Sequence, residues 1–196
     1  TANAASLSVN VTTPLSTSIS SSYTTSPIAG AAYTVNALIN GSVATGTPRT
    51  GTLSLVETIG TGADAVTNTL ANVDVSTAPN ASGYYALTVA GGLTAGAHAL
   101  SVVYSGDANY ATSKQTLSTV TARLQTTYVN TSYSTMPIVG SNYTVSASVG
   151  GILTTGVART GTLSLVETVA GVATTLTSVD LTVPPPASGY YALTVT

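Results

Sequence analysis

The chain has 196 residues, a formal net charge of −2 and only 5% charged side chains, with 38 Thr, 24 Ser and no Cys, Trp or Phe. So weak a charge does not favour nucleic acid or an anionic membrane as a partner, and the lack of Cys excludes a disulfide framework and structural zinc. Hydrophobic residues still make up 43% of the chain, so a folded protein with a hydroxyl-rich surface is predicted.

The predicted elements are all β-strands. Tyr33, Val35, Ala37 and Ile39 are apolar and share one face, whereas Thr34 points the other way, which is the two-residue period of a half-buried strand. No segment has a helical period, and clusters of turn residues separate the apolar runs. In chain order, strands are predicted over residues 15–22, 31–39, 51–57, 66–75, 84–89, 98–104 and 112–120.

The same alternation predicts which residues of the later strands face inward. Each of these strands carries large apolar residues at every second position. The inward sets are Leu53 with Leu55, Tyr85 with Leu87 and Val89, and Leu100 with Val102 and Tyr104.

An internal repeat organises these strands. RTGTLSLVET at residues 49–58 returns unchanged at 159–168, 110 positions later, and SGYYALTV at 82–89 returns at 188–195, 106 positions later. The second copy has therefore lost four residues, which we expect in a loop, and Leu55 and Leu165 should be equivalent core positions. The predicted domains are the last strand of a preceding module at 1–13, a complete module at 14–122, and a second module lacking its last two strands at 123–196.

Residues 2–12 match residues 108–121 once three residues are dropped, so both segments are predicted to be the final strand of a module. Two interpretations remain. Either the sequence is a window from a longer tandem protein, or residues 2–12 of one subunit insert into the incomplete module of the next. The first is favoured, because a donated strand would supply only the last strand and leave the preceding one without a source.

Residues 93–110, LTAGAHALSVVYSGDANY, resemble the penultimate strand and following turn of bacterial Ig-like repeat domains. The strands at residues 51–55 and 83–89 also lie where that family has them. The resemblance covers the first copy end to end and the second as far as Thr196. It implies tandem Ig-like antiparallel β-sandwiches of about seven strands, of the kind that build large secreted or surface-anchored bacterial proteins.

His98 is the only histidine, so acid–base catalysis would depend on it or on carboxylates alone. It shares the inward parity of Leu100 and Val102, which favours a hydrogen-bonded structural histidine. We therefore predict no catalytic residue, no enzymatic activity and no cofactor.

Asp107 lies in a Ser-Gly-Asp-Ala-Asn turn, where a carboxylate accepts backbone N–H groups two residues on. A turn-holding role is predicted. Stiffening by calcium is the weaker hypothesis, because Asp64, Asp74 and Asp107 are too few and too scattered for a site of six to eight oxygen ligands. No metal site is predicted.

Arg49 and Glu57 recur as Arg159 and Glu167 in a chain with very few charges. Charged residues often protect the free edge of a sheet from pairing with another chain. Each pair is therefore predicted to guard a sheet edge.

Tyr supplies all eleven aromatic residues, and one ring of each adjacent Tyr pair must face outward. Exposed rings at Tyr84 and Tyr190 are candidates for stacking on a sugar or a neighbouring module. Candidate N-glycosylation sequons begin at Asn10, Asn40, Asn80, Asn130 and Asn142, and O-linked sugar on the Thr-rich faces is equally compatible.

The leading functional hypothesis is a structural repeat of a long extracellular bacterial protein that forms a rigid stalk or filament. Residues 119–125, which join the two copies, contain no Gly or Pro. The expected partners are neighbouring copies of the module, in the same chain or in adjacent subunits, and glycans. No nucleic-acid partner and no membrane insertion are expected, since no apolar run reaches the roughly 18 residues of a membrane helix. The alternative is an adhesive or carbohydrate-binding module of a surface adhesin.

Overall fold

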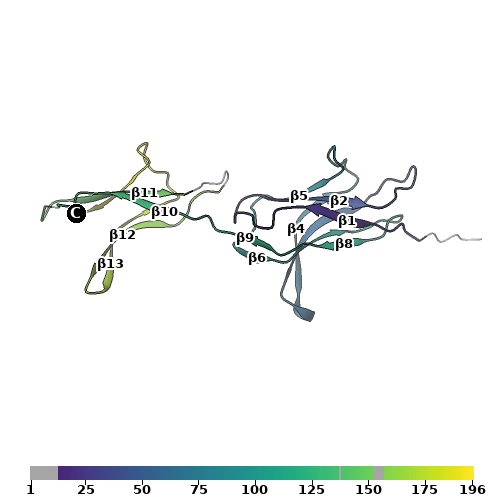
Figure 1. Cartoon of the computed structure of the whole chain (residues 1–196), viewed down its shortest axis with the longest axis horizontal. Coiled ribbons are helices and arrows are strands. Elements are labelled where there is room, and N and C mark those ends of the chain that lie inside the picture. The colour runs from purple at the N-terminus through teal and green to yellow at the C-terminus, as the bar shows by residue number, and fades with distance from the viewer. Residues whose placement is uncertain (1–12, 137, 152–156) are drawn as a thin grey trace, which may run out of the picture. The chain divides into compact units, whose positions relative to one another are not determined.

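The structure is a computed structural model that describes residues 13–136, 138–151 and 157–196. The chain divides into two compact units, and each contains its own sheets (Figure 1). The first unit ends at Arg123 and the second begins at Leu124. The strand predicted at residues 2–12 and the sequon at Asn10 lie outside the described residues.

The first unit is built from short antiparallel strands, which confirms the all-β prediction. One sheet has the order β1-β2-β5, a second has the order β4-β3-β7-β8, and β6 pairs with β9. A single 3₁₀ turn, Gly62–Asp64, lies between β3 and β4. The strands are β1 (Ser18–Ser22), β2 (Tyr33–Asn40), β3 (Thr52–Ile59), β4 (Val66–Asp74), β5 (Tyr85–Val89), β6 (Gly96–His98), β7 (Leu100–Tyr104), β8 (Ser113–Thr116) and β9 (Val120–Ala122).

Two of the predicted strands are divided in the structure. The segment predicted at 98–104 forms the end of β6 and all of β7, and the segment predicted at 112–120 forms β8 and the start of β9. β7 pairs with β8 in one sheet, whereas β6 pairs with β9 in another. Each of the two predicted segments therefore contributes to two different sheets. The division depends on which strands pair, and a local alternation pattern does not carry that information.

The core of the first unit lies between its two larger sheets, as the alternation predicted. Tyr33, Val35, Ala37 and Ile39 of β2 are each at most 4% exposed. They pack in one cluster with the inward residues of the facing strands, each 0% exposed, namely Leu53 and Leu55 of β3, Leu87 of β5, and Leu100, Val102 and Tyr104 of β7. Burying each of the leucines contributes about 1.5–3 kcal/mol relative to an exposed side chain.

The second unit repeats the first five strands in the same register. Its sheets have the orders β10-β11-β14 and β12-β13. Thr162 pairs with Asp180 as Thr52 pairs with Asp74, and both β3 and β12 carry a bulge at the equivalent position. The strands are β10 (Tyr128–Ser132), β11 (Tyr143–Gly150), β12 (Thr162–Val169), β13 (Val172–Asp180) and β14 (Tyr191–Val195).

The four residues missing from the second copy are accounted for by one hairpin. Residues 60–65 connect β3 to β4, whereas only Ala170 and Gly171 connect β12 to β13. Both of these residues have positive φ, at 50° and 83°. Two such residues in succession are typical of the type I′ turn, whose twist matches that of the flanking strands.

The core of the second unit is smaller than that of the first. It consists of Val145, Ala147, Leu163, Tyr191 and Leu193. Leu165 is only half-buried, although its counterpart Leu55 is 0% exposed. The prediction that these two leucines are equivalent core positions is therefore wrong, because no described strand of the second unit occupies the place of β7.

Candidate functional sites

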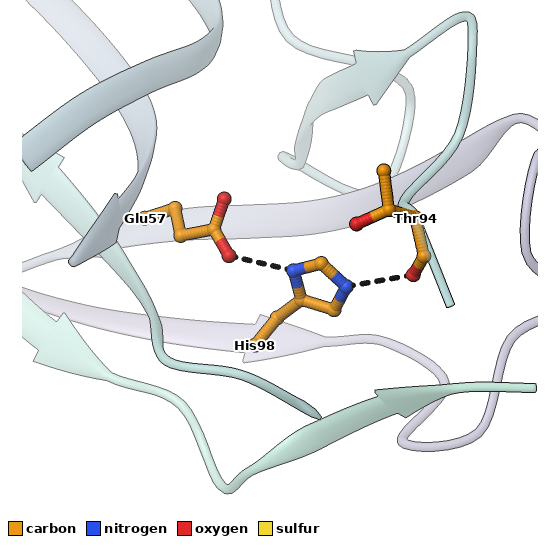
Figure 2. Close-up of polar contacts among 3 residues, drawn as sticks. All are labelled: Glu57, Thr94 and His98. Atoms are coloured by element: carbon orange, nitrogen blue, oxygen red, sulfur yellow. Dashed lines mark hydrogen bonds and ion pairs between the residues drawn. The ribbon is translucent and has the colours of Figure 1, made fainter. Parts of the chain in front are cut away.

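A short hydrogen-bonded chain joins Glu57, His98 and Thr94 (Figure 2). Nδ1 of His98 lies 2.6 Å from Oε1 of Glu57, and Nε2 lies 2.8 Å from the carbonyl oxygen of Thr94. A backbone carbonyl only accepts, so Nε2 carries a proton, and the ionised carboxylate accepts from a second proton on Nδ1. The geometry thus favours the imidazolium form of a ring that is only 6% exposed.

The surroundings of His98 have opposing effects on its charge. Burial opposes the charged ring, whereas the hydrogen bonds to Thr94 and Glu57 and the negative charge of Glu57 favour it. The balance raises the pKa of His98 above its ordinary value of 6.5. The ion pair links β3 to β6, two strands that do not pair with each other.

This arrangement positions a cation but leaves no basic ring nitrogen for a substrate. A general base needs an unprotonated nitrogen within hydrogen-bond reach of the proton it removes, and both nitrogens of His98 face acceptors. Within the described ranges, no group of three or more His, Cys, Asp and Glu side chains could hold a metal ion.

Asp107 holds its own turn and also joins that turn to a distant loop. Its Oδ1 accepts the backbone N–H groups of Asn109 and Tyr110, at 2.7 and 2.9 Å. Its Oδ2 accepts the N–H and the hydroxyl of Thr50, at 2.8 and 3.1 Å, and the hydroxyl of Tyr104 at 3.3 Å. Although desolvation opposes ionisation, these hydrogen bonds lower the pKa of Asp107 from 3.8 to about 2.

The prediction that Arg49 and Glu57 guard a sheet edge is wrong for the first unit. Glu57 lies in β3, which has neighbours on both sides, and it binds His98. Arg49 precedes β3 and donates to the carbonyl oxygens of Ile39 and Gly41, at 3.0 and 2.7 Å. Both charges therefore join separate segments within the unit.

Two buried tyrosines that were not singled out as site residues hold the loop before β3. The hydroxyl of Tyr110 accepts the N–H of Ala44 at 3.0 Å and donates to the carbonyl of Thr47 at 2.6 Å. The Cζ atom of Arg49 lies over the Tyr110 ring, 5.3 Å from the ring centroid. Tyr104 donates to the carbonyl of Thr50 at 2.7 Å. The inward parity of Tyr104 is visible in the sequence, but the loop carbonyls to which the two tyrosines donate lie more than 50 residues away.

The two tyrosines singled out as contact candidates differ in their surroundings. Tyr190 is 41% exposed while its neighbour Tyr191 is buried. Tyr84 is half-buried and borders a polar depression of about 290 Å³ on the sheet that contains β1, β2 and β5. The other residues lining this depression are Ser22, Asn36, Asn80 and Ser82.

Four of the five sequons lie in the described chain. Asn80, Asn130 and Asn142 are exposed, and Asn80 uses Oδ1 to accept the N–H groups of Ser82 and Tyr84. Asn40 is half-buried, and its Nδ2 donates to the hydroxyl of Ser20 at 3.1 Å. Since Nδ2 is the atom that carries an N-linked sugar, Asn40 is the least accessible of these four positions.

No protein family and no curated protein matches this chain. In the part of the chain that the structure describes, no helix is long and apolar enough to cross a membrane.

Proposed function

We propose that the chain is a tandem pair of Ig-like modules from a long extracellular bacterial protein, in which such modules form a rigid stalk or filament. The observation that carries this proposal is the repetition of one strand arrangement with the same registers in both units. In the first unit, β1, β2 and β5 face the sheet β4-β3-β7-β8, a grouping typical of Ig-like sandwiches. The partners are then neighbouring modules, in the same chain or in adjacent subunits.

The contacts at the end of the first unit support a stiff assembly. The N–H of Arg123 donates to the carbonyl of Pro27, and the N–H of Ala29 donates to the carbonyl of Arg123, both at 2.9 Å. The first unit thus holds the chain as far as Arg123, and β10 begins at Tyr128. The four residues between them include no Gly or Pro, and so short a connection restricts bending.

Small-angle scattering of the full chain tests this stiffness. We expect a narrow distribution of interatomic distances, with a maximum that does not change between low and high salt because few charges are available to screen. The matched control carries four Gly-Ser residues inserted after Gln125 and should give a broader distribution. A distance distribution for the native chain as broad as that of this control would contradict the proposal.

An adhesive role is the second candidate, and the depression beside Tyr84 favours it. Amide and hydroxyl groups beside an aromatic ring suit the polar edge and apolar face of a sugar. The second unit provides an internal comparison, because Pro186 stands where the first unit has Asn80, and Ser146 replaces Asn36.

A glycan array probed with the full chain tests the adhesive role. Binding should be lost on Tyr84→Ala and retained on Tyr190→Ala, because only the first unit carries both amides at this position. Equal loss in both variants, or no binding by the native chain, would count against a sugar site at Tyr84.

A further inference from the structure

In each unit, one free edge of a sheet is a long strand without charged protection. Among the described strands, β4 pairs only with β3, and β13 pairs only with β12. Each is nine residues long and contains no Lys, Arg, Glu or Pro, and its single Asp is the last residue. Proteins usually protect such an edge with lysine, proline or a covering segment. Both edges are therefore available to a strand of another chain.

The most accessible part of this edge is the first half of β4. Residues 66–69 are exposed, whereas three of the five residues that follow are partly buried. After the strand, the hydroxyl of Tyr85 donates to the carbonyl of Val75 at 3.0 Å and ties the chain to β5. The first half of β4 belongs instead to the end of the β3–β4 hairpin, which extends beyond the other strands of the unit (Figure 1).

The same hairpin end carries an exposed apolar pair in the first unit. Ile59 pairs with Val66, and the two residues are 53% and 58% exposed. β7 and β8 complete the sheet of this unit without covering the pair. Packing within the unit therefore does not explain why both residues are apolar.

The second unit repeats this feature. Val169 pairs with Val172, and they are 62% and 68% exposed. The connections differ, since residues 60–65 join β3 to β4 and only Ala170 and Gly171 join β12 to β13. The apolar pair is thus kept although the turn beside it has changed.

The backbone of β4 directs hydrogen-bonding groups toward the open edge at alternate residues. Thr58 of β3 donates its N–H to Ala99, so its backbone faces away from β4. Thr67 lies opposite Thr58. In an antiparallel pair the residues of a non-hydrogen-bonded position direct their N–H and C=O groups away from each other. Thr67 and, two residues on, Thr69 therefore present these groups to the open edge.

We propose that the β4 edge pairs in the antiparallel direction with the β4 edge of a second copy of this chain, with Asn68 at the two-fold axis. In this register Thr67 lies opposite Thr69 of the second copy, and the two residues exchange backbone hydrogen bonds. Val66 lies opposite Leu70 of the second copy, so apolar side chains meet. The register uses the five residues that precede the shift in pairing between β3 and β4.

The partner is a second copy because this register makes the edge complementary to itself. A two-fold axis places the same patch on both sides of the contact, so each favourable pair occurs twice. Cross-strand pairs of Thr with Thr and of Val with Leu stabilise a sheet. Residues 66–70 contain no charged side chain, so two copies do not repel each other along this stretch.

β13 offers an edge of the same kind. By the equivalent register, Ala173 and Thr175 take the positions of Thr67 and Thr69. Val172 and Leu176 keep the spacing of Val66 and Leu70. This lateral contact is independent of the stalk proposal, which depends on the connection between the units, so either can fail without the other.

Sedimentation equilibrium of the full chain tests the contact. We expect reversible association between about 10 μM and about 1 mM, because five paired residues form a small contact. A four-lysine edge variant places lysine opposite lysine and should lower the association constant at least about 10-fold. Its substitutions are Thr67→Lys, Thr69→Lys, Ala173→Lys and Thr175→Lys.

A second variant tests the register. It keeps Lys at positions 67 and 173 but has Glu at positions 69 and 175. The proposed pairing then places lysine opposite glutamate, and this variant should associate at least as strongly as the native chain.

The control for net charge has four lysines at exposed turn positions away from the edges. It has the same charge as the four-lysine edge variant and should associate at least several-fold more strongly than that variant. Its substitutions are Ala78→Lys, Ala81→Lys, Ser141→Lys and Ala187→Lys.

Amide hydrogen exchange by NMR locates the contact in the native chain. Exchange at Thr67 and Thr69 should slow as the concentration rises, whereas Asn68, whose backbone faces β3, should change little. No association at about 1 mM would overturn the proposal, as would equal association by the four-lysine edge variant and its charge control. Association that leaves exchange at Thr67 and Thr69 unchanged would also overturn it.

Discussion

At the scale of single residues, the first unit is held by a few charged groups that link segments far apart in the sequence. Because His98 has a raised pKa, the folded state binds its proton more tightly than the unfolded chain does. Its stabilising contribution is then complete below the unfolded pKa and is lost as the pH rises through the folded pKa. Asp107 has a pKa of about 2 and Tyr104 has a pKa of about 12. Neither residue changes its charge in the pH range where His98 titrates.

We therefore expect the free energy of unfolding of the first unit to fall as the pH rises from below 6.5, the ordinary pKa of histidine, through the higher pKa of His98 in the folded state. Urea denaturation of the full chain, followed by the NMR signals of Leu53 and Val102, measures it. His98→Gln and Glu57→Gln should each flatten the dependence. A slope that survives both substitutions would exclude this ion pair as its source.

Sequence reasoning places such residues on a face but does not find their partners. The inward parity of His98 could be predicted, and the turn-holding geometry of Asp107 is local. Glu57 is 41 residues from His98, and Thr50 is 57 residues from Asp107. Only the pairing of β3 with β7 brings them together, and strand pairing is a property of the whole sandwich.

At the scale of elements, local sequence patterns were sufficient to predict a strand that has one buried face and one solvent-facing face. The alternation predicted β2, β3 and β5 closely, because each has one face in the core. It did not predict the separation of β6 from β7, where one continuous extended segment contributes a strand to each of two sheets. It also did not predict that β3 is an inner strand, which explains the wrong assignment of Arg49 and Glu57.

The β12–β13 hairpin leads to a second prediction. Ala170 has φ of 50°, a region that alanine adopts only at a cost, and it precedes Gly171 in a two-residue turn. Asn tolerates this conformation and Asn-Gly is the preferred pair for a type I′ turn. Ala170→Asn should therefore stabilise the second unit by about 0.5–1 kcal/mol.

Thermal denaturation followed by the NMR signals of the second unit measures this gain. Ala173→Asn, in the adjoining strand, is the control and should give no gain, because strands disfavour Asn. Destabilisation by Ala170→Asn would show that the turn does not require the left-handed backbone conformation at this position.

At the scale of the whole molecule, the repeat predicts equivalent strands but not equivalent burial. Tyr33 pairs with Val89 as Tyr143 pairs with Val195, so the backbone pairing of the two units agrees. Burial depends on what covers each face. Leu55 is 0% exposed and pairs with Val102 of β7, whereas no described strand pairs with β12 at the equivalent edge beside Leu165.

The two leucines should therefore respond differently to truncation. Leu55→Ala removes a fully buried side chain from a closed core and should cost the first unit about 2–5 kcal/mol. Leu165→Ala should cost about 1 kcal/mol or less, because water already reaches this half-buried side chain. The controls Thr52→Ala and Thr162→Ala should stay within about 0.5 kcal/mol. Urea denaturation with unit-specific NMR signals measures all four. Equal costs for the two leucines would mean that Leu165 is as well covered in solution as Leu55.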